Sequence, residues 1–214
     1  MNINEPSIEI AKVLLQINAI KINLANYFTW ASGLKAPIYC DNRKTLSYPE
    51  ARNFIKSEFV NAIKKNFGKL DLIAGVATGA IAQGALVADY LGLPFVYVRS
   101  SPKKHGLENL IEGVTKKGQS VLVIEDLVST GASSLKAVDA LRKAGCNVLG
   151  MLAIFTYGFK IAEDNFKNAD CKLITLSNYE TLIAYAHKNN IVSDNDLVSL
   201  RKWRTDPENW VATI

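Results

Sequence analysis

The sequence has little of what a metal-binding or disulfide-stabilised protein needs. It contains two histidines, His105 and His187, and three cysteines, Cys40, Cys146 and Cys171, which lie far apart and form no C-x-x-C pair. This spacing argues against a zinc site, and an odd number of scattered cysteines is typical of a chain in a reducing compartment. We therefore expect three free, buried thiols and a cytoplasmic protein.

Long apolar runs are also missing. No stretch approaches the roughly 18 residues that a membrane-spanning helix requires. The N-terminal stretch MNINEPSIEIAKVLL places no basic segment ahead of an apolar one, so the sequence predicts no signal peptide. We expect no membrane partner.

Acidic residues are outnumbered by basic ones, 20 against 25, which leaves a net charge of +5. Such an excess suits either nucleic acid or phosphorylated small ligands. The basic residues are scattered, and no aromatic residues are interleaved with them as a surface for stacked bases would need. We therefore predict no nucleic-acid partner and expect the cations to face the phosphate groups of a small ligand.

Apolar runs dominate the chain after residue 68. The chain has 214 residues, 49% of them apolar, which is ordinary for one globular domain. Five runs are separated by helical patterns or polar segments, and they cover 71–77, 94–100, 120–126, 147–155 and 171–177. Continuous apolar runs indicate strands that are buried on both faces. The sequence thus predicts an α/β fold with a mostly parallel central sheet flanked by helices.

Helix signals lie on both sides of this region. The pattern predicts a first helix over 5–20 with Ser7 as its N-cap, a second over 49–68 capped by Ser47, and a last one capped by Ser193. His187 falls at the end of a further helix. We expect it to be a favourable charge at that helix C-terminus rather than a catalyst.

Ligands of open α/β sheets bind beyond the carboxyl ends of the strands, near the point where the strand order reverses. Three of the predicted strand ends carry unusual residues, within 75–84, 98–106 and 124–134. None of them contains the Gly-Lys-Ser/Thr of a Walker A loop or the pattern G-x-G-x-x-G. The common nucleotide-binding folds are therefore disfavoured.

The third of these ends places two acids directly after a buried strand. Glu125 and Asp126 follow the apolar residues 121–124, and hydroxyl-bearing and small residues fill 129–133 before a helix begins. Buried or half-buried charges need partners. Backbone amides at a helix N-terminus bind phosphate, and carboxylates accept hydrogen bonds from a sugar diol. The stretch therefore indicates a ribose 5-phosphate site, with an ordinary acidic strand–helix turn as the alternative.

The same stretch, VLVIEDLVSTGASS, resembles the motif that binds phosphoribosyl diphosphate (PRPP) in type I phosphoribosyltransferases. Four apolar residues, two acids, two apolar residues and a hydroxyl-rich loop follow one another in the family's order. The resemblance implies the type I phosphoribosyltransferase fold in a single domain over 1–214. A small N-terminal hood would occupy about 20–46, and a PRPP-binding core about 68–180.

Two further stretches resemble orotate phosphoribosyltransferases. FTWASGLKAPIYCDNR resembles their hood, with its S-G-x-x-(S/A)-P-x-Y core, and VRSSPKKHGLENLIEG resembles their mobile catalytic loop. Ser129 stands where hypoxanthine-guanine enzymes typically have an aspartate, which disfavours that branch. The resemblance implies an enzyme of pyrimidine biosynthesis, which transfers a phosphoribosyl group from PRPP to orotate and releases diphosphate.

The resemblance also implies a role for each part of the site. Glu125 and Asp126 would hold the ribose hydroxyls, directly or through Mg²⁺. The 5-phosphate would lie against Leu127, Val128, Ser129, Thr130, Gly131, Ala132 and Ser133, with Ser129 also near the pyrimidine. Backbone amides for the diphosphate would come from Ala77, Thr78 and Gly79, whose small side chains allow close approach. The catalytic residues would be Arg99, Lys103, His105 and Asp126.

Two partners of the chain are implied by the same resemblance. Mg²⁺ would be the cofactor, bridging diphosphate and sugar oxygens without a dedicated set of protein ligands. A second copy of the chain would complete a homodimer, in which Arg99, Lys103 and His105 reach the active site of the neighbouring subunit.

The sequence departs from many orotate phosphoribosyltransferases at several positions. Ala31 and Ser100 stand where lysines are common, the loop VATGA has no lysine, and FTYGFK has no arginine after the fourth core strand. The group that binds orotate's carboxylate therefore stays open among Lys35, Arg43 and backbone amides of the hood.

Two other functions remain open as well. One is a phosphoribosyltransferase for adenine or xanthine, which would need a different hood. The other is a PRPP-sensing transcription regulator of the same fold. A helix-turn-helix appendage would favour that regulator, and none is evident before residue 25.

Overall fold

The computed structural model describes residues 5–101 and 110–211. In chain order its elements are α1 (Glu5–Gln16), β1 (Ile20–Ile22), β2 (Phe28–Thr29), β3 (Lys35–Ala36), β4 (Ile38–Cys40), the 3-10 helix η1 (Asn42–Ser47), α2 (Pro49–Asn66), β5 (Leu72–Val76), α3 (Ile81–Leu91), β6 (Phe95–Val98), β7 (Ile111–Glu112), β8 (Ser120–Val128), α4 (Ala132–Lys143), β9 (Asn147–Thr156), α5 (Lys160–Asn168), β10 (Leu173–Asn178), α6 (Tyr179–Lys188) and α7 (Asp194–Thr205).

A six-stranded sheet in the order β10-β9-β8-β5-β6-β7 forms the centre of the molecule. The five apolar runs of the sequence become β5, β6, β8, β9 and β10, and neighbours among them pair in parallel. Their predicted parallel arrangement is confirmed. β7 differs, because it pairs antiparallel with β6 at the sheet edge. Its two residues follow a polar segment and are too few to give a strand signal.

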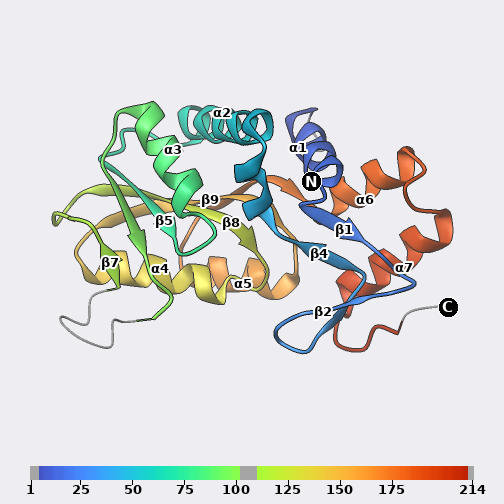
Figure 1. Cartoon of the computed structure of the whole chain (residues 1–214). Coiled ribbons are helices and arrows are strands. Elements are labelled where there is room, and N and C mark those ends of the chain that lie inside the picture. The colour runs from blue at the N-terminus through green and yellow to red at the C-terminus, as the bar shows by residue number, and fades with distance from the viewer. Residues whose placement is uncertain (1–4, 102–109, 212–214) are drawn as a thin grey trace.

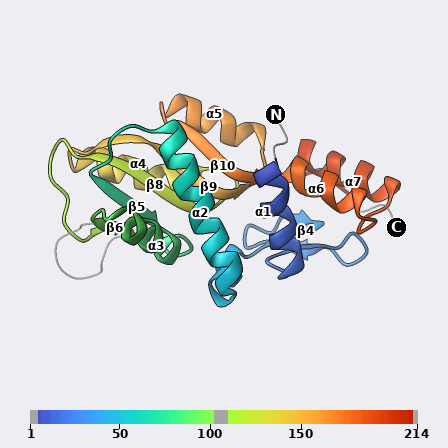
Figure 2. The ribbon, with the colours of Figure 1, turned by 90° about the horizontal axis from the view of Figure 1, so that it is seen from above.

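Helices cover both faces of the sheet. Figure 1 shows α2 and α3 above it and α4 and α5 below it, and Figure 2 shows α1 beside α2 when the molecule is seen from above. The sheet is buried between these layers, and every residue of β5 is buried. Within the described ranges, no helix is long and apolar enough to cross a membrane.

Two of the predicted helix caps are wrong. α1 begins at Glu5, so Ser7 lies inside the helix, where its hydroxyl donates to the hydroxyl of Ser177 on β10. α2 begins at Pro49 as expected, but its N-cap is Tyr48, because Ser47 is the last residue of η1. A hydroxyl residue near a helix start does not by itself fix which residue caps it.

The remaining helix predictions agree better with the structure. Ser193 caps α7 in a reciprocal capping box with Asp196. His187 lies in the last turn of α6, and its Nε2 is 2.7 Å from a carboxylate oxygen of Asp194. α5 was not predicted, because it is only nine residues long and buries just two of them.

The first strands of the chain form two small antiparallel pairs, β1 with β4 and β2 with β3. They lie within the segment 20–46, beside α6 and α7 (Figure 1). The Trp203 indole on α7 donates a hydrogen bond of 3.1 Å to the carbonyl of Lys35. Its ring also meets Trp30 edge-on, with ring centroids 5.6 Å apart. The hood strands thus rest on the C-terminal helix.

Candidate active site

The strand order reverses between β5 and β8. From β5 the chain moves outward to β6, then returns to the opposite side of β5 for β8. The carboxyl ends of β5 and β8 therefore diverge into a crevice of the kind that binds ligands in α/β folds. A cavity of about 320 Å³ opens there, lined by Cys40, Asp41, Arg43, Val76, Ala77, Thr78, Gly79, Val98, Arg99, Ser100, Glu125, Asp126, Leu127, Ser133 and Ala137.

The loop after β5 lies directly against the second acid of the motif. A Cβ atom on Gly79 would overlap the carboxylate of Asp126, so a side chain at this position would displace that carboxylate. The backbone N–H of Ala77 donates 2.8 Å to the carbonyl of Val98, which holds the start of the loop to β6. The structure thus brings Ala77, Thr78 and Gly79 together with Asp126, although 47 positions separate Gly79 from it.

The two carboxylates differ in what surrounds them. Glu125 is 4% exposed, and each of its oxygens accepts a hydrogen bond: Oε1 from the N–H of Asp126 at 2.9 Å and Oε2 from the hydroxyl of Ser134 at 2.8 Å. Burial raises the pKa of Glu125 well above its ordinary value, and the charge of Asp126 adds to this. Glu125 thus ties the end of β8 to the first turn of α4 and also lines the cavity, while Asp126 is the carboxylate that lies against Gly79 in the loop after β5.

Asp126 is less enclosed than its neighbour. Burial raises its pKa, and the nearby Arg43 guanidinium acts in the opposite direction. Buried carboxylates with raised pKa values that line a cavity are characteristic of functional sites. Burying such a group costs stability, so its presence points to a role in binding or catalysis.

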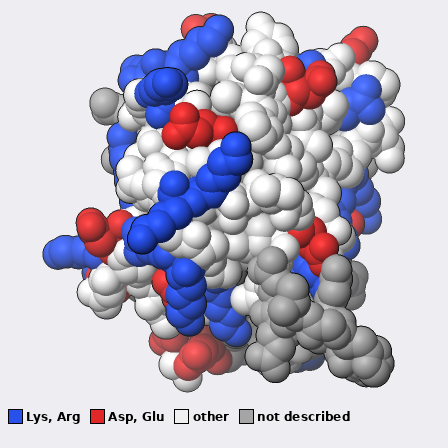
Figure 3. Space-filling view, turned by 90° about the vertical axis from the view of Figure 1, so that its left-hand side faces the viewer, with Lys and Arg blue, Asp and Glu red and all other residues white. Residues whose placement is uncertain are grey.

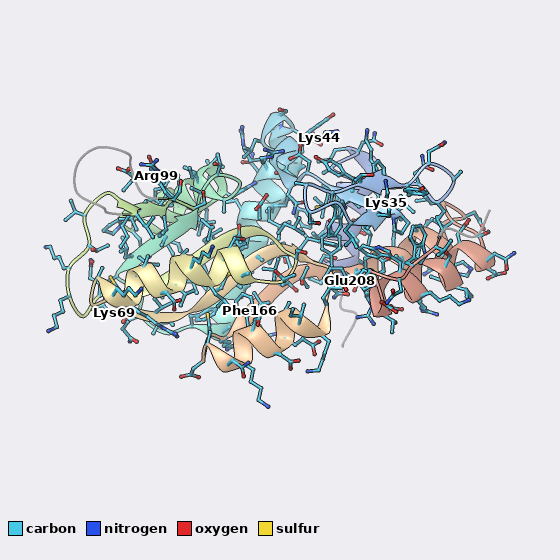
Figure 4. The ribbon with its side chains drawn as sticks, turned by 90° about the horizontal axis from the view of Figure 1, so that it is seen from below. Lys35, Lys44, Lys69, Arg99, Phe166 and Glu208 are labelled. Carbon is cyan, nitrogen blue, oxygen red and sulfur yellow. The ribbon has the colours of Figure 1, made fainter. Side chains whose placement is uncertain are left out.

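The loop between β8 and α4 is held from below by α5. Gly131 has a φ of 79°, and a Cβ on it would lie 2.6 Å from the ring of Phe166. Asn165 donates 2.9 Å from its Nδ2 to the carbonyl of Thr130. Figure 4 shows Phe166 between α4 and α5. A residue other than glycine at 131 would therefore be strained by its backbone and would clash with the ring.

The predicted phosphate-binding residues lie at different depths. Leu127 and Ser133 line the cavity. Val128 is fully buried in the apolar core. Ser129, Thr130, Gly131 and Ala132 lead from β8 to α4 beside the cavity rather than in its wall.

Arg99 follows β6 and lies in the wall of the same cavity. Its Nη1 is 3.4 Å from a carboxylate oxygen of Glu112 on β7, and its backbone N–H donates 2.8 Å to the carbonyl of Leu110. Arg99 also borders a second cavity of about 480 Å³ on the side of Tyr97 and Ser101. The other two predicted catalytic cations, Lys103 and His105, lie outside the described residues.

Two hood residues in the cavity wall, Cys40 and Asp41, were missed by the sequence reasoning, and they lie beside Arg43, which it named as a candidate for orotate's carboxylate. Cys40 ends β4, Asp41 follows it, and Arg43 is the second residue of η1; all three line the same cavity as Asp126. The Arg43 Nε donates 2.6 Å to Asp41, which lowers the pKa of Asp41. The sequence signal that could have indicated these residues is the pair Asp41 and Arg43, which directly follows the short strand β4.

Burial raises the pKa of all three cysteine thiols. All three cysteines are free, as predicted, but only Cys146 and Cys171 are buried, because Cys40 lies in the cavity wall and is half-buried. Burial raises the pKa of Cys40, and the charges of Asp126 and Asp41 raise it further. Cys40 is thus a thiol rather than a thiolate at neutral pH. As for metal ligands, the described part of the chain contains no group of three or more His, Cys, Asp or Glu side chains that could hold an ion.

Comparisons with known proteins agree with this geometry. Residues 51–190 match the family model of the phosphoribosyl transferase domain. The orotate phosphoribosyltransferase of Bacteroides thetaiotaomicron is 60% identical over 202 residues, which are 94% of this chain and 95% of that protein. The chain belongs to the orotate phosphoribosyltransferase family. The orotate phosphoribosyltransferase of Porphyromonas gingivalis is also 60% identical, over 94% of this chain and 96% of that protein.

A solved member of the family shares the fold. The crystal structure of orotate phosphoribosyltransferase from Aeropyrum pernix superimposes with a TM-score of 0.73 at 25% identity, over 86% of this chain and 99% of that one. Family membership confirms the resemblance carried by VLVIEDLVSTGASS and the phosphoribosyltransferase fold with its mainly parallel sheet. The roles of individual site residues in the orotate phosphoribosyltransferase reaction stay predictions.

Proposed function

We propose that this chain transfers the 5-phosphoribosyl group of PRPP to orotate, giving orotidine 5′-phosphate and diphosphate in pyrimidine biosynthesis. The observation that carries the proposal is the contact of Gly79 with Asp126, which joins an amide-bearing loop and a buried carboxylate in one cavity. Relatives that are 60% identical and named orotate phosphoribosyltransferase support orotate over a purine as the base.

PRPP is held at three points in this proposal. The carboxylate of Asp126 accepts hydrogen bonds from the ribose hydroxyls, and Glu125 keeps the backbone of Asp126 in place. The 5-phosphate lies at the N-terminus of α4, where the loop 127–133 offers amides and hydroxyls. The diphosphate lies along Ala77, Thr78 and Gly79, whose backbone can approach it closely. Fixing the sugar in this way aligns its carbon-1 with the attacking nitrogen of the base.

Negative charge develops on diphosphate as its bond to carbon-1 breaks, and the sugar gains oxocarbenium character. Cations placed at the leaving group lower this barrier. Arg99 lies at the cavity with a guanidinium suited to phosphate oxygens. In our proposal, Lys103 adds a point charge and His105 donates a proton or a hydrogen bond to the departing diphosphate.

Arg43 is the hood cation that we propose for orotate's carboxylate. It lies in the cavity wall, whereas the Nζ of Lys35 donates 2.9 Å to Thr29 and lies 5.4 Å from the ring centre of Tyr27. Lys35 is also on the far side of the hood from Arg99 in Figure 4. A guanidinium binds a carboxylate through two parallel hydrogen bonds, which would fix the orientation of the ring.

Mg²⁺ fits this site as a cation that PRPP brings with it. Among the residues that the structure describes, the carboxylates at the cavity are Asp41, Glu125 and Asp126, and they do not form a ligand cluster. Mg²⁺ prefers oxygen ligands and keeps several from water and phosphate. When bound, it would neutralise diphosphate charge, while Asp126 would hold it through the sugar hydroxyls.

We further propose a cytoplasmic homodimer whose subunits exchange the segment that carries Arg99, Lys103 and His105. Three free cysteines support the compartment. On the one face that Figure 3 shows, acidic side chains are interspersed with basic ones, and we propose no nucleic-acid partner.

An absorbance assay tests the proposed reaction. Purified protein with PRPP, Mg²⁺ and orotate should consume the ultraviolet absorbance of orotate, and adenine or xanthine in its place should give no product. The matched control is Asp126→Asn, which keeps the shape of the side chain and removes its charge. We expect kcat/KM for PRPP to fall about 30- to 150-fold, equivalent to roughly 2 to 3 kcal/mol. Unchanged orotate absorbance with the wild-type protein would refute the proposal.

A further inference from the structure

The end of β8 extends beyond its neighbour β5. The last register pair between the two strands joins Gly75 to Ile124, whereas β8 stays paired with β9 as far as Val128. The backbone of β5 then turns away, and the carbonyl of Val76 accepts from the N–H of Ala80 instead. From residue 125 onward, none of the strands in residues 5–101 and 110–211 lies beside β8 on this side.

The backbone of Asp126 faces this open side. The carbonyl of Ser120, six positions earlier, accepts 2.9 Å from the N–H of Asp71 at the start of β5. Because alternate residues of a strand direct their backbone groups to the same neighbour, the N–H and C=O of Asp126 face the side that β5 has left. Backbone groups that are buried without a partner cost about 1 to 3 kcal/mol each, so replacements are expected.

Two side chains supply the missing bonds. The N–H of Asp126 donates 2.9 Å to Oε1 of Glu125. The carbonyl of Asp126 accepts a 2.6 Å hydrogen bond from Nδ2 of Asn42, the first residue of η1. Glu125 belongs to the motif itself, but Asn42 comes from a segment 84 positions away that directly follows the hood strand β4.

Asn42 is itself held rigidly. Its side chain is buried, with a relative exposure of 2% for the residue, and its Oδ1 accepts 3.3 Å from the thiol of Cys40. Its carbonyl accepts 2.6 Å from the hydroxyl of Thr45, which is fully buried one turn along η1. The amide is therefore fixed on the hood side and can fix the end of β8 in turn.

We propose that Asn42 is a positioning residue for the PRPP site: its side-chain amide takes the place of the next strand beside β8 and thereby sets the position of the Asp126 carboxylate against Gly79. This inference rests on the proposed function, since it assigns Asn42 to the binding of PRPP. Asn42 does not line the cavity and need not touch the substrate. It links the hood to the ribose-binding end of β8 through one hydrogen bond.

Two substitutions separate the amide donor from charge and shape. Asn42→Asp keeps the shape but turns the donor into an acceptor, and Asn42→Leu is neutral and removes the donor. Ser177→Ala is the matched control, because the hydroxyl of Ser177 also donates a buried bond of 2.8 Å to a backbone carbonyl, that of Ser7, away from the cavity. All three variants are expected to unfold at a somewhat lower temperature than the wild type.

Only the Asn42 variants should bind PRPP more weakly than the wild type. Calorimetric titration with PRPP and Mg²⁺, without orotate, should give a dissociation constant at least about 10-fold higher for both Asn42 variants and within about twofold of wild type for Ser177→Ala. At saturating PRPP, KM for orotate should stay within about threefold in all of them, whereas a loss of folded protein would lower kcat and leave both constants unchanged.

Either of two results would overturn the inference: PRPP affinity within twofold of wild type in either folded Asn42 variant, or equal weakening in Ser177→Ala. If PRPP binding weakens in Asn42→Asp but not in Asn42→Leu, the inference is also overturned. The added charge, and not the lost hydrogen-bond donor, would then be responsible. The proposed function fails separately. A wild-type protein that binds PRPP but consumes no orotate would refute that proposal, and the binding comparison among variants would still decide the role of Asn42.

Discussion

Ser134 donates a hydrogen bond of 2.8 Å to the buried carboxylate of Glu125, which ties the first turn of α4 to the end of β8. This bond opposes the effect of burial, since it is one of the contacts that lower the pKa of Glu125. The end of β8 and the start of α4, which we propose to hold the ribose and the 5-phosphate, are thereby joined inside the protein, independently of any ligand.

Replacing this serine by alanine should therefore destabilise the protein. Ser134→Ala leaves one oxygen of a buried carboxylate without its donor, at an expected cost of about 1 to 3 kcal/mol in the free energy of unfolding. Urea denaturation measures it. Ser133→Ala removes the neighbouring hydroxyl, which is exposed, and should cost less than about 0.5 kcal/mol. Equal costs for the two serines would show that the bond to Glu125 contributes nothing.

Glu125 should make the stability of the protein depend on pH in an unusual direction. Its pKa in the folded state lies above the reference value of 4.5. At pH values between these two pKa values, the folded protein therefore binds more protons than the unfolded chain. The contribution of Glu125 to the free energy of unfolding therefore falls as pH rises from about 4.5 through the folded pKa, and stays low above it.

Glu125→Gln isolates this effect. Glutamine stays neutral, accepts from the N–H of Asp126 through its oxygen, and can donate to Ser134 through its nitrogen. The stability of the variant relative to wild type should rise between about pH 5 and about pH 8 in denaturant titrations of the ligand-free protein. A difference that is the same at both pH values would mean that Glu125 has the same pKa in the folded and unfolded chain.

Substitutions of Ser129 should change the binding of orotate more than the binding of PRPP. Ser129→Asp introduces the residue typical of the hypoxanthine-guanine branch, and its negative charge would lie near the carboxylate of orotate. We expect orotate binding to weaken by more than about 1 kcal/mol, or roughly fivefold in KM. Ser129→Asn, similar in size but neutral, should have a smaller effect. An orotate KM that stays at the wild-type value in Ser129→Asp would show that Ser129 does not face the base.

The exchange of loops between subunits can be tested by mixing two inactive proteins. One carries Lys103→Ala, with an intact cavity and a defective loop, and the other carries Asp126→Asn, with the opposite defects. After joint unfolding and refolding, about half of the dimers are mixed, and each mixed dimer has one site in which both parts are intact. Activity should recover to about a quarter of wild type.

The control for this mixture is each variant refolded alone, which should stay nearly inactive. If Lys103 acts within its own chain, every site in a mixed dimer keeps one defect. Mixed dimers confirmed by mass but without recovered activity would therefore rule out the shared site.

The sequence predicts those parts of the fold that rest on local patterns. The apolar runs that become β5, β6, β8, β9 and β10 are recognisable because each is buried on both faces. The short strands of the hood have two or three residues, too few to show a period. The site follows the same rule: Glu125 and Asp126 stand out as charges after an apolar run.

Contacts between distant segments are not visible in such patterns. The amide of Asn42 bonds Asp126 across 84 positions, and that of Asn165 bonds Thr130 across 35. An asparagine in an irregular segment or on a short helix reads as a turn former or a surface residue, because nothing local specifies a partner. Their supporting role depends on where β5 ends and where α5 packs, which only the folded chain determines.

The bond from Trp203 to Lys35 has a consequence for the order in which the protein is made. The two partners are 168 positions apart, so on the ribosome the hood strands emerge long before the helix on which they rest. All six strands of the sheet are synthesised in between. A chain interrupted before α7 would hold its complete PRPP motif and the bond from Asn42 to Asp126, yet it would lack the contacts of Trp203 with Lys35 and Trp30. The part of the hood around β2 and β3 should therefore become fixed late in translation, after the sheet itself has begun to resist proteolysis.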